Sequence, residues 1–297
     1  MNNRKVKASF YISLCYLSAA FATFILFAIL GKITLESLPN LNFGFLFTPE
    51  NEAKGFGGGI ANAVVGTILL SLLSTMIASP IAVGTAIYMK RYAKKGRLVK
   101  TFSFMVDVLS GTPSIVLGIF GLMLLVYYMR FITGGFSLIS GSIALSILIL
   151  PVIERAAEEA IQTVPSELEE ASYSLGATKW ETISKITLPY ALPGIITGIV
   201  LSIGRAAEES AVVVLTAGYT QFMPELGITP KDGLLFGIRF SPFQDLVAAL
   251  PITVYHAFEF PGMVSPSEGF AAAFVLIFIV MLINATTRLI VRKRRIN

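Results

Sequence analysis

The sequence predicts an all-α polytopic membrane protein with six transmembrane helices. Of its 297 residues, 55% are hydrophobic and only 14% are charged, and the mean hydropathy is +0.76. A soluble domain carries about 25% charged residues, so much of this chain must face lipid. Six segments have the roughly 20 mostly apolar residues that a bilayer crossing needs. They are 10–30, 60–89, 101–129, 136–153, 191–216 and 270–287.

The first of these segments follows Arg4, Lys5 and Lys7, as the apolar core of a signal peptide would. Its apolar run is longer than the roughly 7–15 residues of a signal peptide, and no convincing cleavage site follows. We therefore expect a retained helix. Residues 1–59 are expected to form this helix and an outer loop, and residues 60–297 to form one transmembrane domain.

The distribution of Lys and Arg predicts the orientation of the chain. Most of these residues lie on one side of the membrane, in the N-terminal segment, in 90–100, in 154–189 and in the C-terminal run 288–295. Basic loops remain in the cytoplasm, so both termini are expected there, in a plasma or inner membrane. This asymmetry accounts for the net charge of +5, which gives no argument for nucleic acid. The single Cys15 excludes an internal disulfide.

Helix breakers occur in the second, third and fourth segments, at Pro80, in the run 110–114 and at Pro151. Membrane helices tolerate such breaks where neighbouring helices or a cavity satisfy the freed backbone groups. Such breaks occur in transport pathways, and they also occur in ordinary kinked helices. Two outer loops are long, 31–59 and 218–269, and the part 243–255 is apolar enough to pack against the outer surface of the spans.

The loop 154–189 is predicted to form a helix, a glycine turn and a second helix. Ser166 and Glu169 fit a capping box, in which each side chain accepts a hydrogen bond from an exposed backbone N–H. The helix that follows should end near Gly176, the residue best suited to a left-handed position. Thr178 and Glu181 repeat the capping pattern. Such a projection can dock into a cleft on a partner; the alternative is an amphipathic hairpin lying on the lipid surface.

Seven residues of this loop follow the spacing EAA-x3-G-x9-I-x-L-P, with serine in place of the second alanine: Glu170, Ala171, Ser172, Gly176, Ile186, Leu188 and Pro189. The loop resembles the EAA loop of ABC importer permeases. The resemblance implies a type I (MetI-like) permease fold and a coupling helix received by a groove on an ATPase subunit. It also implies that ATP and Mg²⁺ bind to that partner, since this chain has no G-x-x-x-x-G-K-[ST] phosphate loop. The chain itself is not expected to be an enzyme or to hold a cofactor.

Further runs resemble the phosphate transport permeases: 111–116, 150–153, 176–180 and 204–209. The entry to the second span at 58–60, the stretch 250–255 and the last span, with Asn284 and Arg288, resemble the PstA group rather than the PstC group. The resemblance implies a permease subunit of an ATP-driven phosphate importer. Its partners would be a PstC-like permease, two ATP-binding subunits and a phosphate-binding protein on the outer face.

Arg205, Glu208 and Glu209 are the only charges deep inside a predicted span. At 1.5 Å per residue, Arg205 lies roughly 21 Å from the inner end of a helix that begins at 191. Ionisable groups within a membrane normally face a bundle interior or a watery cavity. Arg205 and Glu209 are i,i+4 neighbours and can pair. The trio is a candidate translocation path in which Arg205 meets an anion; the alternative is a salt bridge that locks the helix to a neighbour.

The phosphate transport permeases carry Arg and Glu at the positions of Arg205 and Glu209, usually with Gly where this chain has Glu208. They also carry an Arg at the position of Arg155, which the resemblance makes a second candidate for the path. The alternative for Arg155 is an i,i+4 ion pair with Glu159 on a cytoplasmic helix.

The sequence leaves two other functions open and argues against a metal site. A histidine-based metal site is not expected, because His256 is the only histidine. Within the same class, the chain could serve another oxyanion, such as tungstate or sulfate. In a different class, a secondary transporter or channel could use Arg205 and Glu209 as an ion site.

Overall fold

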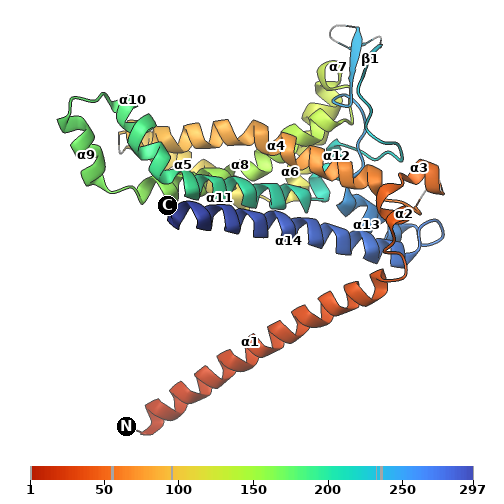
Figure 1. Ribbon diagram of the computed structural model, residues 1–297, viewed down its shortest axis with the longest axis horizontal. Helices are drawn as coiled ribbons and strands as arrows, with labels where there is room; N and C mark the ends of the chain where they lie inside the picture. The colour runs from red at the N-terminus through yellow and green to blue at the C-terminus, as the bar shows by residue number, and fades with distance from the viewer. Residues whose placement is uncertain (1, 55–56, 95, 232, 235–236, 297) are drawn as a thin grey trace.

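The computed structural model describes residues 2–54, 57–94, 96–231, 233–234 and 237–296. Four long helices run side by side: α4 (Ala61–Ile87), α8 (Leu138–Gln162), α11 (Leu188–Ala207) and α14 (Pro266–Ile296) (Figure 1). A fifth helix, α1 (Asn2–Ser37), contacts this bundle near the C-terminal end of α1, and the rest of α1 extends away from the bundle. The expected all-α fold is confirmed, with one short β-hairpin added.

The remaining elements are short or adjoin the long helices: α2 (Phe43–Phe47), α3 (Glu50–Ala53), the π-helical turn η1 (Tyr88–Tyr92), α5 (Arg97–Gly111), α6 (Ser114–Gly121), η2 (Leu122–Tyr128), α7 (Arg130–Thr133), α9 (Ser166–Ser174), α10 (Lys179–Thr182), η3 (Ile183–Thr187), α12 (Ala211–Thr216), β1 (Gly227–Pro230), β2 (Ile238–Ser241) and α13 (Leu250–Glu259). The strands pair antiparallel, with Gly227 opposite Ser241. The hairpin lies at one end of the molecule, and α9 and α10 lie at the other (Figure 1). We call these the hairpin end and the α9 end.

Among the described residues, five helices are long and apolar enough to span a membrane: Lys7–Ser37, Ala61–Tyr92, Leu138–Gln162, Lys179–Ala207 and Pro266–Ala285. The third predicted span, 101–129, is not one straight helix. Arg97–Gly111 and Ser114–Tyr128 meet at an angle of 98°, so six spans result only if this bent pair is one of them. The break arises at Pro113, which lacks a backbone N–H and forces Thr112 into an extended conformation (ψ 130°).

The fifth predicted span, 191–216, also differs from the structure. The helix begins earlier, at Lys179, and ends at Ala207. Glu208 caps it, and α12 follows as a separate short helix from Ala211. The predicted end of this span was therefore wrong, and Arg205 lies in the last turn of α11 rather than within a longer helix.

Small residues bring α8 and α11 into close contact. Gly194 faces Ala160, and Gly198 faces Ala156, with no space left for a further side-chain carbon. Membrane helices commonly associate in this way, because van der Waals packing replaces the hydrophobic effect between them. The adjoining core joins these helices to α4 through Ala78, Ala82, Ile149, Ile153 and Ala206.

The segment 243–255, which was expected to pack on the outer surface of the spans, packs there. Val247, Ala249 and Ile252 are buried in one core cluster with residues of α4 and α8. Ala248 and Leu250 are buried in a second cluster with residues of α14. The segment therefore closes the hairpin end of the bundle.

A buried carboxylate also lies at the hairpin end. Glu50 is 1% exposed, and its carboxylate accepts a hydrogen bond from the Tyr219 hydroxyl. Burial raises the pKa of Glu50 from 4.5 to about 7; the Tyr219 hydrogen bond opposes this rise and nearby Glu268 adds to it. Burial likewise raises the pKa of Tyr219, which therefore keeps its proton and remains the donor.

Replacing Glu50 with glutamine (Glu50→Gln) is expected to make stability less dependent on pH. Between about 4.5 and about 7, folded Glu50 holds a proton that the unfolded chain has released, so wild-type stability falls as pH rises. The glutamine amide would accept the same hydrogen bond without titrating. Melting temperatures across this window measure the effect, with the exposed Glu52→Gln as control. An equal pH slope in wild type and Glu50→Gln would contradict it.

Candidate coupling loop and transport site

Gly176 ends helix α9 in the predicted left-handed conformation, with φ at +83°. The N–H of Ala177 donates to the carbonyl of Ser172 (3.2 Å). The N–H of Gly176 itself donates to the carbonyl of Tyr173 (2.9 Å). These two bonds form a Schellman motif, which satisfies the last carbonyls of the helix and turns the chain sharply. The predicted glycine turn is confirmed.

The second helix begins as predicted, at a capping box. The Thr178 hydroxyl accepts from the N–H of Glu181 (3.3 Å), and the Glu181 carboxylate accepts from the N–H of Thr178 (2.9 Å). This helix does not stop before the span. It runs from Lys179 through the π-helical turn η3 into α11 and ends at Ala207. Pro189 lies in the first turn of α11, where its missing N–H costs little.

The first predicted capping box, at Ser166 and Glu169, is wrong. Pro165 occupies the N-cap position of α9 and makes no side-chain cap. The Glu169 carboxylate instead accepts hydrogen bonds from Arg91 Nε (2.8 Å) and from the Thr187 hydroxyl (2.6 Å). It therefore ties α9 to η1 and to η3, which a local sequence pattern cannot reveal.

Arg91 completes this connection. Its Nη2 donates to the carbonyl of Ile161 at the end of α8 (3.0 Å). The side chains of Arg91 and Glu169 are both largely buried, so the pair is better shielded from solvent than an exposed surface ion pair. We call Arg91, Glu169 and Thr187 the clamp. It holds the loop helix α9 to the ends of two spans and the start of a third.

The loop presents apolar side chains outward. Leu175 is 90% exposed and Trp180 is 61% exposed, and no residue of α9 is buried. The motif residues Glu170, Ala171 and Pro189 are exposed too, while Ile186 and Leu188 are half-buried. Ser172, which replaces the second alanine of the motif, shares a hydrogen bond with the Thr182 hydroxyl (2.9 Å) and so joins α9 to α10.

Arg205 and Glu209 form the predicted ion pair, with Nη2 and Oε2 3.3 Å apart. Glu209 is 5% exposed and its other oxygen accepts from the N–H of Ala211 (3.1 Å), whereas the Arg205 side chain is 48% exposed. The carboxylate is thus held in place and the guanidinium keeps an accessible edge. Glu208 is exposed and caps the helix.

Arg155 has partners other than Glu159, the partner named in the ion-pair alternative. Its guanidinium contacts the carboxylates of Asp107 (2.5 Å) and Glu158 (2.7 Å) and donates to the carbonyl of Ser103 (3.1 Å). These bonds join α5 to α8. Arg155 is therefore occupied by carboxylates, which leaves it less available to an anion than Arg205 is.

The structure does not gather the candidate residues into one site. Gly198 of α11 lies opposite Ala156 of α8, and Arg205 is seven residues farther along α11, or about 10 Å. The motif residue Leu188 lies 17 residues before Arg205, or about 26 Å. The helix Lys179–Ala207 thus holds Ile186, Leu188 and Pro189 in its first half and Arg205 in its last turn, and the other coupling residues precede it.

Comparisons with known proteins identify the family. The model of the family described as "Binding-protein-dependent transport system inner membrane component" matches residues 78–296. The chain belongs to this family. The matched range holds the loop, the clamp, Arg155 and Arg205.

Several relatives of this membrane component are similar over most of their length. "Probable ABC transporter permease protein YqgI" of Bacillus subtilis (strain 168) is 31% identical over 299 residues, covering 96% of this chain and 95% of the relative. "Phosphate transport system permease protein PstA" of Yersinia pestis is 32% identical over 296 residues, covering 98% of this chain and 92% of the relative. "Phosphate transport system permease protein PstA 1" of Mycobacterium tuberculosis (strain CDC 1551 / Oshkosh) is 36% identical over 243 residues, covering 81% and 74%.

A solved structure of the MetNI methionine ABC transporter, in an inward-facing conformation, has a similar fold. The TM-score is 0.60 at 19% identity, over 79% of this chain and 95% of that chain. The similarity confirms the expected MetI-like permease fold. A multi-pass membrane component of this family works with an ATPase and a substrate-binding protein.

Proposed function

We propose that this chain is the transmembrane permease subunit of an ATP-driven phosphate importer. The loop carries the coupling part of the proposal: a helix, a Schellman turn and a capped helix present exposed Leu175 and Trp180 to a partner. The substrate rests on relatives named as phosphate transport permeases, one of which matches 98% of the chain.

In this proposal the other subunits do the chemistry. Two ATP-binding subunits hold ATP and Mg²⁺ and receive the α9–α10 loops of this chain and of a PstC-like permease. A phosphate-binding protein delivers its cargo to the hairpin end. The α9 end and both termini face the cytoplasm of an inner membrane. Residues 1–59 form the first transmembrane helix and an outer loop, and 60–297 form the transport domain.

The most direct test is co-purification of the chain with its partners, followed by an ATPase assay in lipid. We expect an ATPase and a second permease to co-purify, and phosphate with its binding protein to stimulate hydrolysis. Stimulation by another oxyanion instead would overturn the substrate, and a chain that transports without an ATPase would overturn the class.

Within this function, Arg205 is proposed to contact phosphate in transit. Its planar guanidinium suits phosphate oxygens, and Glu209 competes for it and so limits how tightly the anion is held. We propose that ATP binding brings the two coupling loops together and shifts the equilibrium between conformations of the path.

Arg205→Gln is expected to reduce phosphate uptake by about tenfold or more, because a charged hydrogen bond contributes about 1.5–3 kcal/mol. Uptake into proteoliposomes measures this, and co-purification with the ATPase should be unchanged. Glu36→Gln, which neutralises an exposed carboxylate of α1 outside the candidate path, is the control and should retain uptake. If Arg205→Gln fails to assemble, the ion pair is a structural lock and the transport role is wrong.

A further inference from the structure

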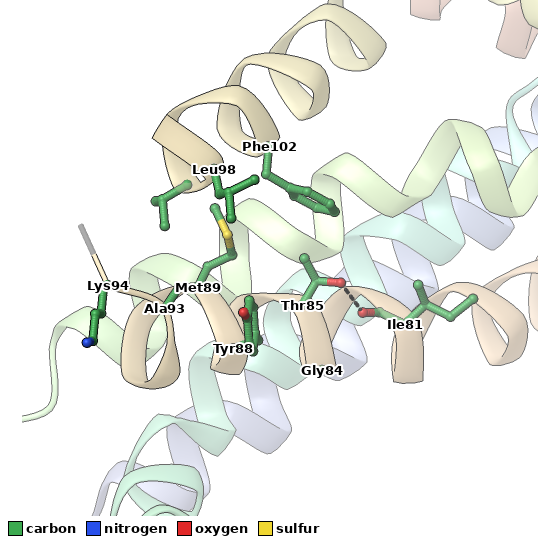
Figure 2. A pocket seen from close by; sticks show the side chains of 10 residues that line it. Ile81, Gly84, Thr85, Tyr88, Met89, Ala93, Lys94, Leu98 and Phe102 are labelled. Carbon is green, nitrogen blue, oxygen red and sulfur yellow. Dashed lines mark hydrogen bonds between the residues drawn. The ribbon is translucent and has the colours of Figure 1, made fainter. Parts of the chain in front are cut away.

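An apolar groove lies between the end of α4 with η1 and the start of α5. Its volume is about 630 Å³. Figure 2 shows Ile81, Tyr88 and Met89 on one side and Leu98 and Phe102 on the other, with Lys94 at one end. The hydroxyl of Thr85 is bonded to the carbonyl of Ile81 (2.8 Å) and so needs no partner in the groove. The interior therefore suits hydrocarbon.

Gly84 forms part of the wall of this groove and leaves it open. A Cβ added at Gly84 would meet no heavy atom within 4 Å. The glycine is therefore not required by close contact with another part of the described chain, in contrast to Gly194 and Gly198. Any larger side chain at this position would enter the groove itself.

A second hollow, of about 480 Å³, adjoins the first and is basic. It is lined by Gly96, Arg97, Val99 and Lys100, and Val99 lines both hollows. Lys94, Arg97 and Lys100 are exposed, and none of them forms a salt bridge with a residue that the structure describes. The basic residues just before them differ, because Lys90 pairs with Glu158 and Arg91 with Glu169.

We infer that this double hollow binds an anionic phospholipid. An acyl chain occupies the apolar groove, and the phosphate group meets Lys94, Arg97 and Lys100. The groove lies where the span Ala61–Tyr92 ends, which is the depth at which headgroups meet acyl chains. Basic pockets between membrane helices bind anionic headgroups in this way, and the three cations otherwise lack counter-ions among the residues that the structure describes.

The inference can be tested on the purified permease complex in nanodiscs of mixed phosphatidylglycerol and phosphatidylcholine. Tightly bound lipid is released from washed complex and quantified. We expect wild type to retain phosphatidylglycerol in preference to phosphatidylcholine. The triple variant Lys94→Gln, Arg97→Gln, Lys100→Gln should lower this preference by about a hundredfold, because each cation near a membrane surface contributes about fivefold and the three contributions multiply.

In Gly84→Leu the added Cβ has no neighbour within 4 Å, and the larger side chain would occupy part of the groove and should remove the bound lipid itself. Gly31→Leu is the matched control, since its Cβ also meets nothing within 4 Å but lies in α1, away from the groove. No preference for phosphatidylglycerol in wild type would overturn the inference. So would loss of a partner subunit from Gly84→Leu with lipid retention unchanged, because the groove would then be a protein interface. Neither result bears on the transported substrate, so the test is independent of the proposed phosphate function.

Discussion

Gly176→Val is expected to abolish ATP-driven uptake while leaving the protein in the membrane. Gly176 has φ at +83°, a conformation that costs an L-residue about 1–2 kcal/mol and a β-branched residue more. Valine would open the Schellman turn and misdirect α9 relative to α10. Uptake into proteoliposomes should fall by about tenfold or more, with basal ATP hydrolysis by the partner subunits retained.

Gly176→Asn is the control for this prediction. Asparagine tolerates the left-handed conformation, and nothing lies within 4 Å of the position of an added Cβ. It should therefore keep the turn and most of the uptake. Normal uptake by Gly176→Val would show that the turn has no coupling role.

Reversing one charge of the clamp is expected to lower ATP-driven uptake about as much as Gly176→Val does. Arg91→Glu would place two carboxylates together at the junction of α9, η1 and η3, and would remove charged hydrogen bonds of about 1.5–3 kcal/mol each. We expect uptake below about a tenth of wild type. The measurement that separates coupling from assembly is phosphate transported per ATP hydrolysed, in complexes that retain the full set of subunits.

The charge-swapped pair Arg91→Glu with Glu169→Arg is the internal control. If the ion pair positions α9, the double variant should recover a substantial part of the coupling that either single variant loses, as expected for an interacting pair. If the single and double variants lost the same amount of coupling, restoring opposite charges would have no effect. The ion pair would then not position the loop.

Local patterns in the sequence predicted the features that depend on local chemistry. The turn at Gly176 and the cap at Thr178 depend on residues within one helical turn, and both formed as predicted. The Arg205–Glu209 pair is of the same kind. Its role in transport stays a prediction.

The features that the sequence did not predict depend on distant partners. Glu169 fitted a capping box, but Arg91, 78 residues away, provides a charged donor that a local cap does not. One alternative for Arg155 was an ion pair with Glu159 on its own helix, whereas Asp107, 48 residues away, lies within reach on α5. The bend in the third span has a local cause instead. Pro113 lies in the run 110–114 of helix breakers, but the sequence does not show that the two halves meet at 98°.

The helix Lys179–Ala207 has a mechanical consequence. It is a single rod of 29 residues, about 44 Å long at 1.5 Å per residue. A rod that pivots about its middle moves its ends in opposite directions, so a tilt of about 10° would displace each end by about 4 Å. Arg205 belongs to this lever, and Glu209 is held to the same end of it, because its N–H donates to the carbonyl of Ala206 (3.4 Å). A push of that size on the loop would therefore carry the Arg205–Glu209 ion pair with it, so that movement at the coupling loop reaches the exposed guanidinium through one helix.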